Sequence, residues 1–563
     1  MNARLSSVSL ALAGSGGAGV MTAGNILLEA AAAAGYYGLM TRTSGPQIRG
    51  GEAAAMLRLS TFATDAQDDR FEIIAAIDWQ NVQRFAAELP LGPASLIVGD
   101  PAQGEPPEVF TKGGARYVPL PLKALAAKVP GGWPNMVALG ALAGLIGLPM
   151  EAIDAAVRKS MKKGIDGALA AARLGSQQVL AIKGFELEET TKRAGRWLIT
   201  GNEAAGYGAL RGGVRFVAAY PITPATELLE WLAPALPKVG GTLVQAEDEL
   251  ASINMIIGAS YGGVPSLTAT SGPGLSLMIE ALGLGVAAEI PIVVVDVMRT
   301  GPSTGIATKS EQADLNIALY GLHGDAPHIV LAPNSVSDCV AVTEWAVGLA
   351  ESLQVPAIVL SDQYFGQARA VIDGPVFHGK NSERVTAKSN GNPYKRYTLT
   401  PSGVSPMAIP GTPGTTYTAD GLEHSERGLP SSQAGDHLAQ VEKRARKIAQ
   451  LDPGDAWASV EGDGDTAVVT FGSCTGPARE ALAREGCRAR LISVRMLAPA
   501  QPQRLKKALE GVKRVVVVEQ NHSGQFLRYL RSEYELPADV RSLRRPGPLP
   551  FRPDEIYREV MKP

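Results

Sequence analysis

Cysteine is scarce in this chain of 563 residues. Its three cysteines, Cys339, Cys474 and Cys487, are widely separated and form no spaced motif. They therefore indicate no disulfide framework and no cysteine-ligated zinc or iron–sulfur site, and no other metal site is predicted for the chain by itself. A reducing, cytoplasmic location is the expectation.

The chain also lacks an excess of positive or negative charge, and it lacks long apolar runs. Fifty-three basic residues face 55 acidic ones, for a net charge of −2, so no nucleic-acid or membrane-surface partner is expected. The apolar run Met136–Pro149 is too short to cross a bilayer and is predicted to be a buried helix. The stretch Val8–Ala13 is short and ends in glycines, which favours a first strand over a signal peptide.

Glycine and proline are plentiful, with 63 and 39 residues, which is typical of many tight strand–helix turns. The length exceeds that of one hydrophobic core and predicts three or four domains. We predict an α/β protein with several domains and parallel or mixed sheets. The expected parts are residues 1–190, residues 195–372 with the strongest strand–helix alternation, a loop-rich connector over 373–455, and a last α/β domain over 456–563.

A glycine-rich loop lies between a predicted strand, Ser6–Ala13, and a predicted helix, Val20–Ala34. Glycines 14, 16 and 19 match G-x-G-x-x-G, and Gly17 adds a fourth. Backbone amides at a helix N-terminus suit a phosphate group. No clear acidic partner follows about twenty residues later, so the evidence for a nicotinamide cofactor is weak. The alternative is that these glycines only permit close strand–helix packing. Arg49, which stands among glycines, is a second candidate for an anion, or else a solvated turn arginine.

Three turns rich in glycine, proline and threonine each follow an apolar strand between residues 200 and 308. They cover residues 219–224 (AYPITP), 268–274 (TATSGPG) and 297–303 (VMRTGPS). The carboxyl ends of parallel strands share one edge of a sheet, and ligands bind in the crevice outside that edge. The three turns are therefore predicted to converge on a ligand site.

Three polar side chains are expected at this edge. Thr223, next to Pro224, has a restricted backbone and an aimed hydroxyl, although it could simply cap a helix. Glu249 is the last of three acids that open the predicted helix Leu250–Tyr261; one of them can enter the cleft while the others stabilise the helix. Arg299 follows an apolar strand and suits bidentate binding of a carboxylate, the alternative being a surface arginine.

Together these motifs resemble the alpha subunits of 2-oxoacid:ferredoxin oxidoreductases in which the gamma domain is fused at the N-terminus. The resemblance is strongest to the 2-oxoglutarate-specific members and covers nearly the whole chain. It is carried by residues 14–19 (GSGGAG), 201–205 (GNEAA), 220–224 (YPITP), 247–249 (EDE) with Gly258 and Ala259, 270–274 (TSGPG), 299–305 (RTGPSTG), 421–426, 519–525 and 550–556. One departure is Ala18, where many relatives carry glutamine.

The resemblance implies an oxidative decarboxylation that uses thiamine diphosphate with Mg²⁺, coenzyme A and ferredoxin. It implies 2-oxoglutarate as substrate and succinyl-CoA as product, with pyruvate or a branched-chain 2-oxoacid as alternatives. It also implies a thiamine pyrimidine-type domain over 195–372, a transketolase C-terminal-like domain over 456–563, and coenzyme A near the first domain, on the side of glycines 14, 16, 17 and 19.

Individual roles follow by matching the family's motifs. Glu249 matches the carboxylate that hydrogen-bonds the aminopyrimidine ring of the cofactor, with Pro221 and Ile222 beside it. Thr223 and Arg299 match residues that meet the substrate's keto and carboxylate groups. Thr308 stands where close relatives have a second substrate-side hydroxyl.

Half of a thiamine site is missing from the sequence. Gly462-Asp463-Gly464 precedes a strand, and no asparagine follows before Asn521, so this triplet is interpreted as a surface turn rather than a magnesium–diphosphate site. The family's beta subunit is expected to supply that site and a [4Fe–4S] cluster, within an (αβ)₂ assembly that reduces ferredoxin. Two other readings stay open: a nicotinamide-dependent dehydrogenase and a non-catalytic α/β ligand-binding subunit.

Overall fold

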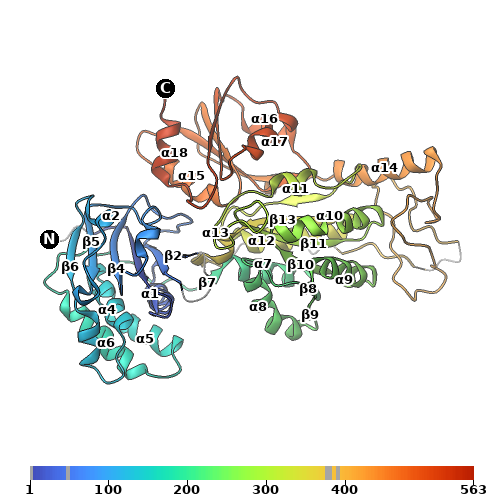
Figure 1. Ribbon diagram of the computed structural model, residues 1–563. Coiled ribbons are helices and arrows are strands. Elements are labelled where there is room, and N and C mark those ends of the chain that lie inside the picture. Colours follow the sequence, from blue (N-terminus) through green and yellow to red (C-terminus); the bar gives the residue numbers. More distant parts are fainter. Residues whose placement is uncertain (1–3, 46–50, 375–382, 389–392) are drawn as a thin grey trace. The chain divides into compact units, whose positions relative to one another are not determined.

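The computed structural model forms two compact units (Figure 1). The first unit runs to Thr200 and adds Gln367–Gly374 and Phe551–Glu555; the second comprises the rest. The residues that the structure describes are 4–45, 51–374, 383–388 and 393–563. Within these ranges, no helix is long and apolar enough to cross a membrane.

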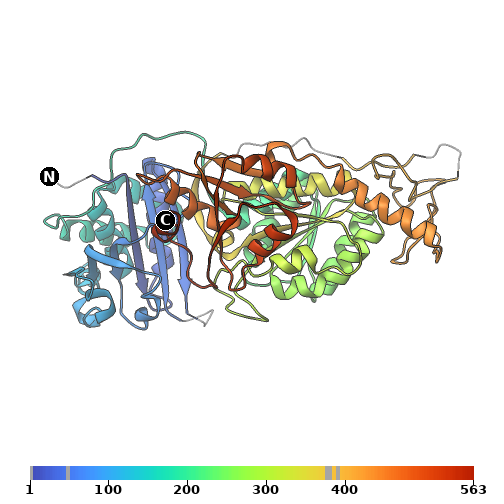
Figure 2. The same cartoon turned by 90° about the horizontal axis from the view of Figure 1, so that it is seen from above.

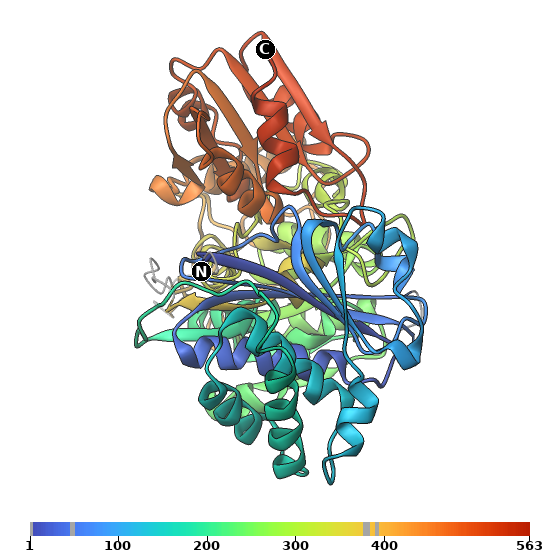
Figure 3. The same ribbon diagram turned by 90° about the vertical axis from the view of Figure 1, so that its left-hand side faces the viewer.

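The first unit is built on an eight-stranded mixed sheet (Figure 3). Its strands are β1 (Ser7–Gly14), β2 (Tyr37–Ser44), β3 (Ala53–Ser60), β4 (Phe71–Ala76), β5 (Leu91–Gly99), β6 (Arg116–Pro119), β7 (Arg196–Thr200) and β14 (Arg369–Asp373). Their order is β6-β5-β4-β1-β3-β2-β14-β7. Strands β6, β5, β4 and β1 are parallel, whereas each pairing from β1 to β7 is antiparallel.

Helices cover this sheet, and the larger apolar core lies between the two layers. They are α1 (Val20–Ala34), α2 (Glu108–Thr111), α3 (Leu122–Ala127), α4 (Pro134–Ile146), α5 (Met150–Ser160) and α6 (Ile165–Gln178), with the 3-10 turns η1 (Val82–Phe85) and η2 (Pro101–Gln103). The predicted buried helix is α4, which packs closely on α6. A β-carbon on Gly140 of α4 would stand 1.7 Å from the carbonyl oxygen of Ala172 on α6, so only glycine permits this approach.

The second unit contains a seven-stranded sheet in the order β18-β12-β13-β11-β10-β8-β9. Its strands are β8 (Phe216–Ala219), β9 (Thr242–Gln245), β10 (Ser266–Thr270), β11 (Ile292–Met298), β12 (Ile329–Leu331), β13 (Pro356–Asp362) and β18 (Met496–Ala498). All pairings are parallel except that of β18 with β12. The apolar strand β11 lies in the middle and is wholly buried, because helices cover the sheet on both sides.

The helices of this domain alternate with the strands, as the sequence predicts. They are α7 (Gly201–Gly212), α8 (Thr226–Ala235), η3 (Leu236–Val239), α9 (Glu249–Tyr261), α10 (Gly272–Ala287), α11 (Leu315–Tyr320), α12 (Asp338–Leu353) and α13 (Gln363–Gln367). Helix α7 packs against α12 and α8, and α9 packs against α10. This doubly wound arrangement brings the ends of β8, β9, β10 and β11 to one edge.

A five-stranded sheet, in the order β15-β17-β16-β19-β20, completes the second unit. Its strands are β15 (Ala458–Glu461), β16 (Thr466–Thr470), β17 (Ala489–Val494), β19 (Arg514–Glu519) and β20 (Asp539–Arg544). The accompanying helices are η4 (Gly454–Trp457), η5 (Gly472–Cys474), α15 (Thr475–Leu482), α16 (Pro502–Ala508), α17 (Gln525–Glu533) and α18 (Pro553–Val560). Only the β15–β17 pair is antiparallel. The predicted several-domain α/β fold with parallel and mixed sheets is confirmed.

The connector ends in α14 (Ala434–Ala449), which lies at one end of the second unit (Figures 1 and 2). Its described loops contain no helix or strand before α14. They are nevertheless packed: Tyr397 stacks on His424 with ring centroids 3.6 Å apart. Lys443 and Lys447 of α14 both form ion pairs with Glu289, and all three side chains are fully buried. The connector is thus anchored electrostatically as well as by its aromatic rings.

Two strands lie in a different sheet from their sequence neighbours. The expected boundaries at 195 and 372 group β7 and β14 with the second domain, whereas both pair into the sheet of the first unit. The physical reason is that β14, which directly follows α13, inserts between β2 and β7 and pairs with both. Such long-range pairing is not encoded by the local periodicity of the sequence.

Candidate active site

The turn after β8 and the turn after β11 meet, as the sequence predicts. Arg299 donates a hydrogen bond from Nη1 to the carbonyl oxygen of Thr223, at 2.6 Å. Buried Asn202 of α7 donates from Nδ2 to the carbonyl oxygen of Pro224, at 2.9 Å, and so fixes the same turn from the other side. Helix α8 begins only at Thr226, with Ala225 as its N-cap, so the alternative interpretation of Thr223 as the helix cap is wrong.

The three acids at the start of α9 have different environments, as the sequence suggests. Asp248 is the N-cap and accepts a hydrogen bond from the amide of Ala251, at 2.7 Å. Glu247 is exposed, whereas Glu249 is buried. A β-carbon on Gly274 would lie 2.8 Å from Oε1 of Glu249, so this carboxyl group rests against the start of α10. Among the described residues, none donates a hydrogen bond to it.

Arg299 lies at the end of the central strand with only 6% of its surface exposed. Its Nε is buried without an acceptor. Burial lowers the pKa of the guanidinium, and the nearby Asp314 and Asp296 act in the opposite direction. The guanidinium forms no ion pair in the described part of the chain and so can accept an external carboxylate as its counter-ion.

Thr308 belongs to a loop that folds back on Arg299. The amide of Thr300 donates to the carbonyl oxygen of Lys309, at 2.9 Å, and Thr300 also bridges to Ile306. Gly305 has a φ of +56°, and a β-carbon there would lie 1.7 Å from the carbonyl oxygen of Thr300. This closed loop holds the half-buried Thr308 beside the residues that follow Arg299. Pro221 and Ile222 are half-buried in the turn before Thr223.

The glycine loop in the first unit is only partly open. The amide and hydroxyl of Ser15 both donate to the carboxylate of Asp78, the hydroxyl at 2.7 Å, so one predicted free amide is already satisfied. Asn135 donates to the carbonyl oxygen of Gly19. Gly16 and Gly17 are exposed, and Gly17 has a φ of +89°, which favours glycine. The second anion candidate, Arg49, lies outside the described residues.

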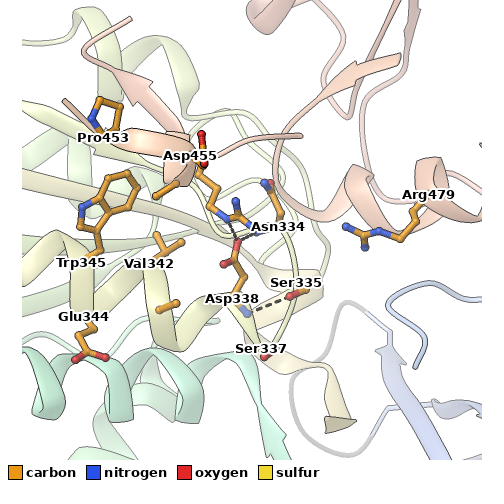
Figure 4. Close-up of a pocket in the computed structure, with 13 residues that line it drawn as sticks. Asn334, Ser335, Ser337, Asp338, Val342, Glu344, Trp345, Pro453, Asp455 and Arg479 are labelled. Carbon is orange, nitrogen blue, oxygen red and sulfur yellow. Dashed lines mark hydrogen bonds and ion pairs between the residues drawn. The ribbon is translucent and has the colours of Figure 1, made fainter. Parts of the chain in front are cut away.

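A separate cleft of about 660 Å³ opens at the start of α12 (Figure 4). Its walls include Asn334, Ser335, Asp338, Trp345, Asp455 and Arg479. The carboxylate of Asp338 accepts hydrogen bonds from the amide of Asn334 and from Arg495, and Arg479 pairs with Glu461. None of the predicted site residues lines this cleft, and its charged residues Asp338, Arg479 and Arg495 already have partners.

Sequence reasoning missed three residues of the site: Asn202, Asp296 and Asp314. The signal for Asp296 was present, because it is the one charged residue in the otherwise apolar strand β11. Asn202 and Asp314 belong to segments whose contacts with the turns are set by the tertiary fold. Asn202 stands in the motif over residues 201–205, but that motif does not indicate its contact with the Pro224 carbonyl oxygen, and nothing in the local sequence marks Asp314.

The residues at this edge suit thiamine diphosphate. Activating its aminopyrimidine ring requires a carboxyl group that can hold a proton at a ring nitrogen, in a site shielded from water. Glu249 is such a group: it is buried, lacks an internal donor and faces the space that Gly274 leaves free. Once bound, the cofactor supplies the carbon nucleophile for attack on an oxoacid.

Comparison with known proteins points the same way. Residues 207–443 match the family model described as pyruvate flavodoxin/ferredoxin oxidoreductase, thiamine diphosphate-binding, and residues 9–178 match the pyruvate ferredoxin/flavodoxin oxidoreductase model. The chain is 31% identical to 2-oxoacid:ferredoxin oxidoreductase 2, subunit alpha, of Aeropyrum pernix over 94% of each chain. It is 31% identical to 2-oxoglutarate oxidoreductase subunit KorA of Mycobacterium tuberculosis, over 99% of this chain and 91% of that one.

A solved structure is similar over the full length. The 2-oxoglutarate:ferredoxin oxidoreductase from Magnetococcus marinus, with 2-oxoglutarate, coenzyme A and succinyl-CoA bound, has a TM-score of 0.91, 34% identity and 99% coverage of both chains. Fold and site therefore define a thiamine-diphosphate-dependent oxidoreductase. Within that class, the chain belongs to the family of 2-oxoacid:ferredoxin oxidoreductase alpha subunits. The nicotinamide-dehydrogenase reading is thereby set aside.

Proposed function

We propose that this chain is the alpha subunit of a 2-oxoglutarate:ferredoxin oxidoreductase. The reaction converts 2-oxoglutarate and coenzyme A to succinyl-CoA and carbon dioxide, and the two electrons released reduce two ferredoxins. The observation that carries the proposal is that Arg299 meets the Thr223 turn at the same edge of the sheet to which α9 brings the buried Glu249, and that no described residue donates a hydrogen bond to the Glu249 carboxyl group. The full-length likeness to the Magnetococcus marinus enzyme supports 2-oxoglutarate over pyruvate or a branched-chain oxoacid.

The proposed roles follow from chemistry and position. Glu249 holds a proton at the pyrimidine nitrogen of thiamine diphosphate, with Pro221 and Ile222 lining the ring. Arg299 binds a substrate carboxylate, while the hydroxyls of Thr223 and Thr308 orient the oxoacid. Positioning of this kind lowers the activation free energy by several kcal/mol, on the order of 7–11 kcal/mol at the upper limit, because it makes the reaction effectively intramolecular.

Exposed apolar side chains on α9 and α10, near Glu249, support the proposal that a partner subunit binds there. Leu250 and Met255 of α9 have exposed fractions of 51% and 42%, and Leu277 of the adjacent α10 is 49% exposed. Exposed apolar side chains gathered next to a reaction site are typical of an interface. We place there the beta subunit, which supplies the Mg²⁺–diphosphate site and the [4Fe–4S] cluster in an (αβ)₂ assembly.

The remaining assignments complete the proposal. Residues 1–190 form the gamma-type domain, where the loop of glycines 14, 16, 17 and 19 lies on the coenzyme A side and offers the exposed Gly16 and Gly17 to that ligand. Residues 195–372, apart from β7 and β14, form the pyrimidine domain, residues 373–455 the connector and residues 456–563 the C-terminal domain. The assembled enzyme works in the cytoplasm and transfers electrons to ferredoxin.

The test is reconstitution with the beta subunit. The complex is assayed for coenzyme A-dependent reduction of a low-potential viologen with 2-oxoglutarate, pyruvate and 2-oxoisovalerate. We expect the highest kcat/KM with 2-oxoglutarate. Preference for another oxoacid contradicts the substrate assignment alone, whereas a cluster-bearing complex that oxidises none of the three contradicts the whole proposal and favours a non-catalytic subunit.

A further inference from the structure

The loop that begins at Arg299 has an exposed crest and a buried end. Residues 302–306 at the crest are half-buried in none of their positions but exposed throughout, whereas residues 310–312 have exposed fractions of at most 7%. We call residues 310–313 the loop foot. The hydroxyl of Thr300 donates to the carbonyl oxygen of Lys309, at 3.2 Å, and so ties the first part of the loop to the foot. Whatever fixes the foot therefore also fixes the loop.

The foot lies at the carboxyl ends of β16 and β19 in the five-stranded sheet. From β16 the chain passes through α15 to β17 on one side, and from β19 it passes through α17 to β20 on the other side. The sheet thus switches direction between these two neighbouring parallel strands. In open α/β sheets, ligands bind in the crevice at such a switch point. Here the loop foot occupies this position.

Gln312 makes the central contacts of the foot, and its side chain is fully buried. Its Nε2 donates to the carbonyl oxygen of Phe471, directly after β16, at 2.7 Å. Its Oε1 accepts from the amide of Gln520, directly after β19, at 2.8 Å. The amide of Gln312 also donates to the carbonyl oxygen of Gln520, at 2.8 Å. One side chain thus bonds the ends of both strands, as a ligand in that crevice would.

Two further glutamines hold the foot on either side of Gln312. Gln520 donates from Nε2 to the carbonyl oxygen of Ser310, at 3.3 Å. Gln525, the first residue of α17, donates from Nε2 to the carbonyl oxygen of Ala313, at 2.9 Å. Both belong to the motif over residues 519–525, which the proposed function leaves without a role. The contacts give this motif a task, which is to hold the loop foot.

We propose that Gln312 is a positioning residue, through which the five-stranded sheet holds the loop after Arg299 in the geometry that binds the oxoacid. This rests on the roles of Arg299 and Thr308 given under the proposed function. If the foot is released, the loop gains conformational freedom, and binding of the oxoacid then has to order it again. The C-terminal domain thereby contributes to the affinity for the oxoacid.

Gln312→Leu nearly preserves the volume of the side chain but leaves the Phe471 carbonyl and the Gln520 amide without their partner. Losing such buried hydrogen bonds should raise KM for 2-oxoglutarate by about tenfold or more, while KM for coenzyme A stays within about twofold. Gln440→Leu is the matched control. Gln440 is also fully buried and donates from Nε2 to a backbone carbonyl, that of Tyr397 in the connector, at 3.2 Å. It should keep both KM values.

Gln312→Glu tests the hydrogen bonds themselves. A protonated glutamic acid can donate to the Phe471 carbonyl and accept from the Gln520 amide, as glutamine does, whereas the ionised form has no donor. Burial raises the pKa of a carboxyl group. The ratio of the variant's KM for 2-oxoglutarate to that of the wild type should therefore be close to one at about pH 6 and rise to about tenfold by about pH 9. A loss of overall stability would not be limited to this KM.

Hydrogen exchange in the assembled complex gives a readout without turnover. Inside the loop, the amide of Thr300 donates to the carbonyl oxygen of Lys309, and the amide of Lys309 donates to that of Ile306, at 3.0 Å. Both amides should exchange about tenfold faster or more in Gln312→Leu, because the loop opens more often. Exchange in β11 should not change, and Gln440→Leu should match the wild type in the loop.

Three outcomes overturn the inference: loop exchange that does not change in a folded Gln312→Leu complex, an unchanged KM for 2-oxoglutarate, or equal changes in Gln440→Leu. A complex that oxidises no oxoacid contradicts the proposed function, yet loop exchange still tests the role of Gln312.

A second variant decides the question if Gln312→Leu does not assemble. A β-carbon on the half-buried Gly547 would lie 2.4 Å from the carbonyl oxygen of Ser310 and 2.7 Å from Oγ1 of Thr300. Gly547→Ala therefore pushes on the foot without removing a side-chain hydrogen bond. It should raise KM for 2-oxoglutarate and speed up loop exchange, and wild-type values of both would overturn the inference.

Discussion

Glu249 and Gly274 are packed so closely that a β-carbon on Gly274 would lie 2.7 Å from Cγ of Glu249 and 2.0 Å from Oγ1 of Thr270. The acid therefore enters the sheet edge through a gap that the first turn of α10 leaves open. Because Asp248 caps α9, the backbone after it directs the next side chain inward. Three elements, β10, α9 and α10, thus cooperate to place one carboxyl group.

Glu249→Gln is expected to lower kcat by about 10²–10⁴-fold in the assembled complex, because glutamine cannot hold a proton for the pyrimidine ring. The side chains have the same shape, so assembly and the thermal midpoint should be unchanged. Glu247→Gln, two residues away at an exposed position, is the control and should keep wild-type kcat. Wild-type-like turnover by Glu249→Gln would rule out its role in cofactor activation.

Gly274→Ala tests the packing behind that role. The added methyl group collides with Thr270 and Glu249, so either the carboxyl group or the helix must shift, and kcat should fall by at least tenfold while KM changes less. The matched control is Gly258→Ala in α9, where a β-carbon meets nothing within 4 Å. This control should retain activity and gain up to about 1 kcal/mol from helix propensity. Equal kinetics of the two variants would show that Gly274 does not govern the position of Glu249.

Local sequence patterns predicted much of the fold and of the candidate site. Helix α1 has the predicted bounds, Val20–Ala34, because an apolar run bordered by turn residues encodes it directly. Thr223, Glu249 and Arg299 were predictable because each marks the end of a strand or the start of a helix in a parallel sheet. The Asn202, Asp296 and Asp314 contacts were not, since each depends on which elements become neighbours after folding.

The connector illustrates the same limit. Its composition predicts irregular loops, and the described loops are irregular, yet they are packed around Tyr397 and His424. The opposing charges of Glu289 and Lys443 are 154 residues apart in the sequence. Charge pairing over such a separation leaves no local signature.

Glu72 of β4 should make the first unit less stable as pH rises. Burial raises its pKa to about 7, although the amide of Ser9 donates to it at 2.6 Å. The pKa of this carboxyl group is higher in the folded chain than in the unfolded chain, where it is 4.5. Its contribution to stability is therefore fully present below pH 4.5 and is lost as the pH rises through about 7. The loss amounts to roughly 3 kcal/mol at most.

Glu72→Gln, which keeps an acceptor for Ser9, should therefore stabilise the unit at about pH 8 and have little effect at about pH 4. Hydrogen exchange in β1 and β4 of the full chain measures this change locally. Glu105→Gln, at an exposed site in the same unit, should leave exchange unchanged at both pH values. A stabilisation that is the same at both pH values would contradict the assigned titration.

Glu289 should be essential to the anchoring of the connector. It is fully buried at the end of α10 and is the common counter-charge of Lys443 and Lys447, while Arg396 donates to its carbonyl oxygen at 2.8 Å. Burial lowers the pKa of Lys443 to about 7, so even with this counter-charge the ammonium is only marginally stable there. Glu289→Gln leaves two buried ammonium groups uncompensated and should cost about 3–5 kcal/mol.

The thermal midpoint of the second unit should accordingly fall by several degrees, and hydrogen exchange in α14 should accelerate. Without Glu289, the lysines release their protons more readily than in the unfolded chain, so the variant should regain stability as pH rises toward about 10. Adding Lys443→Met and Lys447→Met should restore much of the midpoint at neutral pH, because apolar side chains of similar length need no counter-charge. Glu280→Gln, on the exposed face of α10, is the control and should change the midpoint little. If Glu289→Gln unfolds like this control, the connector is held by its aromatic packing and the buried ion pairs are dispensable.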